Sequence, residues 1–168
     1  MADNLTSHPK STAQIGGHPI HAMLVSFPIA FFVGALACDL AYQATPDAFW
    51  LTATLYLLGA GVMMALVAAV FGFIDFLGDA RIRALTVAWG HMLGNLILVL
   101  LQAVNWYRRY DMGEAAIPNL GISLSVLAVL VMLVTGWLGW EMVYRKHVAV
   151  ADEDEASHYE QHAIGGRR

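Results

Sequence analysis

The hydrophobic positions fall into four long apolar stretches that are separated by short polar connections. Each stretch is long enough for an α-helix of about 20 residues, which is the length needed to cross the hydrocarbon core of a bilayer. The predicted membrane spans are residues 19–42, 49–76, 84–110 and 121–144. Short connections favour antiparallel neighbours. The pattern therefore predicts an all-α integral membrane protein, an up-down bundle of four transmembrane helices with the N and C termini on the same side.

Polar segments flank this predicted transmembrane domain, which we place at residues 18–147. Residues 1–17 form a polar N-terminal tail. Residues 148–168 are rich in acidic and polar side chains, and a segment of this composition cannot bury enough apolar surface to fold. We therefore expect the C-terminal tail to be disordered.

Composition agrees with a membrane protein and excludes several functions. Hydrophobic residues make up 58% of the chain and charged residues only 13%, with a mean hydropathy of +0.58. The net charge of −4 offers no basic face for nucleic acid. The single cysteine, Cys38, excludes an intrachain disulfide. No motif of hydrolytic or phosphate chemistry is present, so an electron-transfer or accessory membrane protein is favoured over a stand-alone enzyme.

The basic residues near the spans are distributed unequally between the two sides of the membrane. The side of the termini carries five of them: Lys10, Arg81, Arg83, Arg145 and Lys146. The opposite side carries only Arg108 and Arg109. The positive-inside rule therefore predicts a multi-pass protein of a bacterial inner membrane with both termini in the cytoplasm.

Ionisable residues inside spans are costly to place in lipid and are candidates for function. Five of them are predicted at similar depth near the side of the termini: His18, His21, Asp75, His91 and Glu141. On the opposite side only Asp39 approaches the membrane. The predicted bundle therefore has one layer of histidines and carboxylates.

Helical periodicity indicates where these side chains point. His91 shares a stripe with the amides Asn95, Gln102 and Asn105, which should face the bundle interior. His21 shares a face with Pro28, and this proline predicts a kink one to two turns beyond the histidine. His18, followed by Pro19, is expected to cap the first helix.

Two pairs of short segments in the two halves of the chain are faintly similar, which indicates either an internal repeat or a coincidence. "HAMLV" and "HMLGN" each contain a histidine, and "FGFIDF" and "TGWLGWE" close the second and fourth spans. Related halves would place His21 and His91 opposite each other on diagonal helices. Glycines at five positions remove side-chain volume from this half of the bundle, either for close helix packing or for a flat ligand: Gly72, Gly90, Gly94, Gly136 and Gly139.

Four segments together resemble a known family: "HPIHAMLVSFPIAFF", "GFIDF", "HMLGN" and "GWLGWEMVYRKHVAV". The chain is similar over about residues 16–150 to small bacterial four-helix membrane proteins catalogued as domain of unknown function 2231. The His-Pro-x-His opening is the most specific motif. Family members usually have proline directly after the second histidine, where this chain has Ala22. The resemblance implies the fold and a membrane location, and it implies no activity.

The first functional hypothesis is a cytochrome b-like electron-transfer protein. His21 and His91 would be the axial ligands of one b-type haem held between diagonal helices, with Asn95 nearby. Arg81, Arg83 or Arg145 would neutralise the haem propionates. Electrons would pass to or from a quinone or a redox partner protein.

Two other hypotheses use the same residues. In the second, a zinc, iron or manganese ion, bound or transported, is held by ligands from the ionisable layer: His18, His21, Asp75, His91 and Glu141. In the third, the protein is an accessory subunit of a larger membrane complex, and His21 and His91 only hydrogen-bond Asp75 or Glu141. A homodimer is compatible with each hypothesis.

Overall fold

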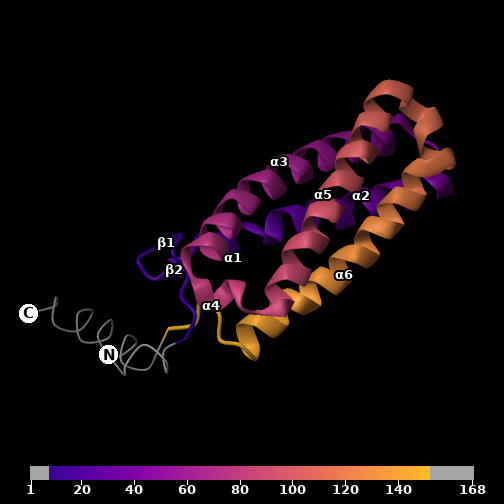
Figure 1. Cartoon of the computed structure of the whole chain (residues 1–168). Coiled ribbons are helices and arrows are strands. Elements are labelled where there is room, and N and C mark those ends of the chain that lie inside the picture. The colour runs from indigo at the N-terminus through magenta and orange to yellow at the C-terminus, as the bar shows by residue number, and fades with distance from the viewer. Residues whose placement is uncertain (1–7, 152–168) are drawn as a thin grey trace, which may run out of the picture.

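The computed structural model describes residues 8–151, and its four long helices lie side by side (Figure 1). Within these described residues, four helices are long and apolar enough to cross a membrane: Ile20–Ala44, Ala48–Gly78, Thr86–Ala115 and Ile122–Tyr144. Most of their large apolar side chains are exposed on the outside of the bundle, as a lipid environment requires. The predicted four-helix membrane fold is confirmed.

The first span is divided into two helices, α1 (Ile20–Leu24) and α2 (Ser26–Ala44). Pro28 lies in the first turn of α2 and has no backbone N–H to donate to the carbonyl of Leu24. The break at Val25 thus lies where the proline predicts a kink, one turn beyond His21.

The other spans begin and end at recognisable caps. Helix α3 (Ala48–Gly78) starts after Asp47, whose carboxylate accepts a hydrogen bond from the backbone N–H of Phe49 at 2.7 Å. The short α4 (Ala80–Arg83) leads into α5 (Thr86–Met112), which ends at Gly113 with a φ of 56°. A 3₁₀ turn, η2 (Gly113–Ala115), and a π-helical turn, η3 (Ile117–Gly121), precede α6 (Ile122–Tyr144).

The helices form a closed ring in which α2 packs on α3, α3 on α5, α5 on α6, and α6 on α2. Helices α2 and α5 are therefore diagonal, and α1 continues the line of α2 while packing on α3. One apolar cluster fills the middle of the bundle: Phe32, Ala35, Leu58, Val62, Leu98, Ala128 and Met132. A smaller cluster near the termini contains Phe76, Ile82, Ala88 and Val148.

The described part of the N-terminal segment is packed against the bundle. Strands β1 (Gln14–Ile15) and β2 (His18–Pro19) form a small antiparallel hairpin. The backbone N–H of Ala149 donates to the carbonyl of Pro9 at 2.8 Å, so the chain before α1 meets the chain after α6 at one end of the bundle. The tail predicted to be disordered lies outside the described residues from position 152 onward.

A close helix contact in the core tests this packing. The ring of Phe32, which is 1% exposed, occupies the position that a Cβ atom on Gly61 would need. We expect Gly61→Ala to cost about 1–3 kcal/mol of stability because a fully buried ring must move. Thermal unfolding in detergent measures this loss.

Gly136→Ala is the matched control, because no atom lies within 4 Å of a Cβ built there. Alanine is the better helix former, so this variant should be unchanged or slightly more stable. An equal loss of stability in the two variants would contradict the described packing of α2 on α3.

Candidate functional site

The two histidines that open the first and third spans lie together inside the bundle. His21 comes from α1 and His91 from the diagonal helix α5, and the centres of their rings are 6.2 Å apart. The ring planes are almost perpendicular, at 88°. Residues 70 positions apart in the sequence thus bring two imidazoles to the same level of the bundle.

Each histidine is oriented by a backbone carbonyl of the neighbouring helix. Nδ1 of His21 lies 2.8 Å from the carbonyl oxygen of Ala68 on α3, and Nδ1 of His91 lies 2.9 Å from that of Thr135 on α6. A carbonyl oxygen can only accept, so Nδ1 carries the proton in both rings. In the neutral imidazoles, Nε2 therefore carries the lone pair that could bind a metal.

A glycine one turn beyond each accepting carbonyl makes room for the ring. A Cβ atom on Gly72 would lie 2.9 Å from Nδ1 of His21, and a Cβ atom on Gly139 would lie 3.1 Å from Cε1 of His91. Both are closer than ordinary van der Waals contact. The two halves of the chain therefore build equivalent settings, consistent with the repeated sequence motifs.

Asn95 adds a contact to one histidine only. Its side-chain nitrogen donates to the backbone carbonyl of His91 at 2.8 Å and lies 3.3 Å from Nε2 of the same residue. Within the described part of the chain, no group is hydrogen-bonded to Nε2 of His21. The two imidazoles are thus held alike at Nδ1 and differ at Nε2.

The two carboxylates of the predicted ionisable layer are engaged elsewhere. Asp75 Oδ1 accepts hydrogen bonds from the Ser11 hydroxyl at 2.8 Å and from the backbone N–H groups of Thr12 and Ala13 at 2.7 Å each. Glu141 forms an ion pair at 3.6 Å with Arg145. Asp75 therefore fastens the N-terminal segment to α3, and the histidines bond backbone carbonyls instead of carboxylates.

His18 is also apart from the pair. It lies in β2, is exposed, and its Nδ1 donates to the carbonyl of Gly16 at 2.9 Å. The prediction that His18 caps the first helix is wrong, because Pro19 occupies the N-cap position without a side-chain hydrogen bond. Among the described residues, no three histidine, cysteine, aspartate or glutamate side chains are grouped so that they could share a metal ion.

The arginines proposed for haem propionates lie at the same end of the bundle and are mostly bonded within the protein. Arg81 forms an ion pair at 2.7 Å with Asp79, and this guanidinium holds the pKa of the Asp79 carboxyl well below its usual range. Arg83 donates to the carbonyls of Phe76 and Leu77 at the end of α3. Arg145 is more exposed, at 63% of its side chain, and lies over the ring of Trp140.

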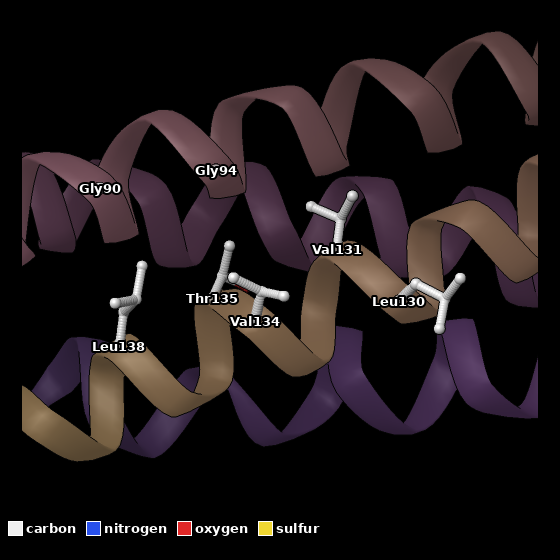
Figure 2. A pocket seen from close by; sticks show the side chains of 7 residues that line it. All are labelled: Gly90, Gly94, Leu130, Val131, Val134, Thr135 and Leu138. Atoms are coloured by element: carbon white, nitrogen blue, oxygen red, sulfur yellow. The ribbon is translucent and has the colours of Figure 1, made fainter.

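A groove of about 280 Å³ lies between α5 and α6, beside the helix contact that holds His91. Figure 2 shows Leu138 and Thr135 of α6 pointing toward the backbone of α5 at Gly90 and Gly94. The remaining lining side chains are apolar: Leu130, Val131 and Val134. The groove opens on the lipid-facing surface, since Val134 is 62% exposed.

A second polar cluster lies in the opposite half of the bundle. Asp39 on α2 and Arg109 on α5 form two hydrogen bonds of 2.7 Å, and both side chains are buried. Thr54 and Ser125 donate to the same carboxylate at 3.2 and 2.7 Å. The cluster is completed by Asn105, which contacts Arg109, Ser125 and Gln102.

Sequence reasoning missed this ion pair, although its signal is present. Arg109 follows Asn105 by four residues and so continues the stripe of His91, Asn95, Gln102 and Asn105. The positive-inside rule instead treats Arg109 as a cation at the membrane surface. The expectation that the half of the bundle opposite the termini holds no comparable polar layer is therefore wrong, because Arg109 and Asp39 neutralise each other in the interior.

The apolar cluster separates the two polar layers on every helix. Phe32 and Ala35 lie between His21 and Asp39, and Leu98 lies between Asn95 and Gln102. Leu98 is 5% exposed and interrupts the polar stripe of α5. The polar groups therefore do not form a continuous path along the bundle within the described residues.

Comparison with known proteins agrees with this architecture. The family model described as "Predicted membrane protein (DUF2231)" matches residues 17–152. The chain belongs to this family. The DUF2231 match includes all four spans and both histidines of the pair. No curated protein and no solved structure matches the chain.

The buried ion pair of this DUF2231 protein gives a direct test of the second cluster. We expect Asp39→Asn or Arg109→Met alone to cost about 3–5 kcal/mol, because each leaves an uncompensated charge in the interior. The double variant Asp39→Leu with Arg109→Met should recover much of this stability. Thermal unfolding in detergent distinguishes these outcomes.

Glu141→Gln is the control, because it removes an exposed ion pair and should cost less than about 1 kcal/mol. A double variant as unstable as the single variants would contradict the account of Asp39 and Arg109 as a closed, mutually neutralising pair.

Proposed function

We propose that the protein is a membrane-embedded electron-transfer protein that holds one b-type haem between His21 and His91. The observation that carries this proposal is the pair of imidazoles from diagonal helices, each with Nδ1 bonded to a backbone carbonyl. Histidines that bind metals commonly donate their second ring N–H to a carbonyl or carboxylate, which fixes the tautomer and orients Nε2.

The separation of the rings supports one metal centre between them. Two imidazoles bound on opposite sides of a metal, with metal–nitrogen distances of about 2.0 Å, have ring centres about 6 Å apart. The observed separation is 6.2 Å. Gly72 and Gly139 allow each ring to lie against its neighbouring helix, which leaves the opposite edge of the ring for the metal.

The number of ligands favours haem iron over a free ion. Zinc and manganese sites in proteins use three or more protein side chains. Haem iron already has four porphyrin nitrogens and needs only axial ligands. Since the described residues supply two histidines and no third histidine, cysteine or carboxylate nearby, the site suits haem better than the five-ligand alternative.

The surroundings indicate how such a centre would be used. Arg145 is the exposed cation that remains best placed to meet a haem propionate at the surface. The apolar layer of Phe32 and Leu98 argues against ion transport along the bundle interior. Electrons would therefore pass from the haem either to a quinone in the surrounding bilayer or to a redox partner protein at the end of the bundle where the termini lie.

The distribution of basic residues supports the proposed orientation in a bacterial inner membrane. Ion pairs engage Arg109 on the side opposite the termini, and Arg81 and Arg145 on the side of the termini. The positive-inside rule counts the basic residues themselves and therefore still favours both termini in the cytoplasm.

A visible absorption spectrum of the detergent-purified protein tests the proposal. The protein is expressed with haem supplied, and spectra are recorded before and after reduction with dithionite. We expect a Soret band and a sharp α band on reduction. His21→Ala and His91→Ala should each lose the bis-imidazole spectrum, because one axial ligand is removed.

His18→Ala is the matched control, since His18 belongs to the exposed hairpin and should leave the spectrum unchanged. A colourless protein that contains zinc, iron, manganese or copper in stoichiometric amount would overturn the haem proposal and show that the protein binds a metal ion instead. A folded protein with neither haem nor metal would overturn the proposal in favour of an accessory subunit.

A further inference from the structure

The two halves of the chain differ at one position that acts on the histidine pair. The residue four positions after His91 is Asn95, whereas the residue four positions after His21 is Val25. Both histidines have an accepting carbonyl, from Ala68 and Thr135, and a glycine beside the ring, although the first span breaks at Val25 while α5 continues through Asn95. An amide therefore stands beside one of the two proposed ligands where the other has an apolar side chain.

The hydrogen bonds fix which end of the Asn95 amide faces the histidine. The backbone carbonyl of His91 can only accept, so the atom 2.8 Å from it is the amide nitrogen. The same nitrogen has a second hydrogen and lies 3.3 Å from Nε2 of His91. Nδ1 of this ring donates to Thr135, which leaves Nε2 as the acceptor of that second hydrogen.

Asn95 thus competes with a metal for the lone pair of Nε2. When His91 binds iron, the amide must give up its contact, and when His91 is released, the amide provides a partner in an interior where an unsatisfied polar atom is costly. His21 has no such alternative partner within the described residues. The His21–iron bond should therefore be permanent and the His91–iron bond exchangeable.

We infer that His91 is a displaceable sixth ligand and that the position it vacates binds a neutral diatomic molecule. This inference rests on the proposed haem. A neutral diatomic ligand fits because the pair lies inside a helix bundle in which charge is costly and space is small. Such molecules dissolve in hydrocarbon, and the groove beside Thr135 opens on the lipid-facing surface.

Carbon monoxide is the probe for this position. The purified holoprotein is reduced with dithionite and titrated with carbon monoxide while the Soret band is recorded. The wild-type spectrum should shift as carbon monoxide replaces His91. Asn95→Val removes the alternative hydrogen bond and should raise the half-saturating concentration about fivefold, the effect of one typical hydrogen bond.

Val25→Asn is the matched variant, because it gives His21 the amide that His91 has in the wild type. It should lower the half-saturating concentration. Asn95→Ala removes the same hydrogen bond with a smaller side chain and serves if the valine variant fails to fold. Loss of stability alone would not move the carbon monoxide affinity in opposite directions in the Asn95 and Val25 variants.

The outcomes separate this inference from the proposed function. A reduced haem spectrum that carbon monoxide leaves unchanged, or equal carbon monoxide affinity in the wild type and both Asn95 variants, would overturn the inference while the haem remains. If neither the wild type nor any variant binds haem, the proposed function fails and the inference fails with it.

Discussion

The constraint that shapes this protein is the absence of water inside a bilayer. A polar group within the bundle must find its partner in the protein, because hydrocarbon offers none. The chain meets this constraint with two hydrogen-bonded polar layers and an apolar layer between them. In one, Asp39 and Arg109 neutralise each other across diagonal helices. In the other, His21 and His91 bond the backbone carbonyls of neighbouring helices. Among the described residues, Nε2 of Gln102 in the first layer and Nε2 of His21 in the second have no hydrogen-bond partner. Both layers depend on close helix contacts, and those at the histidines require Gly72 and Gly139.

The two layers differ in what they leave available. The carboxylate of Asp39 accepts hydrogen bonds from Thr54, Ser125 and Arg109. This layer therefore serves to hold the helices together. The histidine layer bonds only Nδ1 of each ring to the backbone. Nε2 of His21 has no partner among the described residues, and Nε2 of His91 contacts only the Asn95 amide, so this layer offers nitrogen atoms that could bind a metal. Its carboxylate neighbour Asp75 instead holds the N-terminal segment. The proposed function therefore belongs to the histidine layer.

Much of the fold could be predicted from the sequence, because four long apolar stretches admit few arrangements in a membrane. Helical register predicts that His21 and His91 face the interior in the half of the bundle near the termini, whereas their position opposite each other is predicted only if the two halves of the chain are related. Their partners could not be predicted, since any residue has a backbone carbonyl and only the packed helices show which ones are reachable. The same reason hid the role of Asp75, which accepts from backbone N–H groups of Thr12 and Ala13. The buried position of Arg109 could have been predicted, because this residue continues the polar stripe of α5. A count of basic residues near the membrane surface hides that signal.

The proposed haem site requires that the two perpendicular imidazoles bind the same iron. Electron paramagnetic resonance of the oxidised holoprotein tests it most directly, because the signal of ferric haem depends on the angle between its axial imidazole planes. Because the ring planes are at 88°, we expect the strongly anisotropic low-spin signal typical of perpendicular axial imidazoles. A purely high-spin signal, or a low-spin signal typical of parallel imidazole planes, would contradict it.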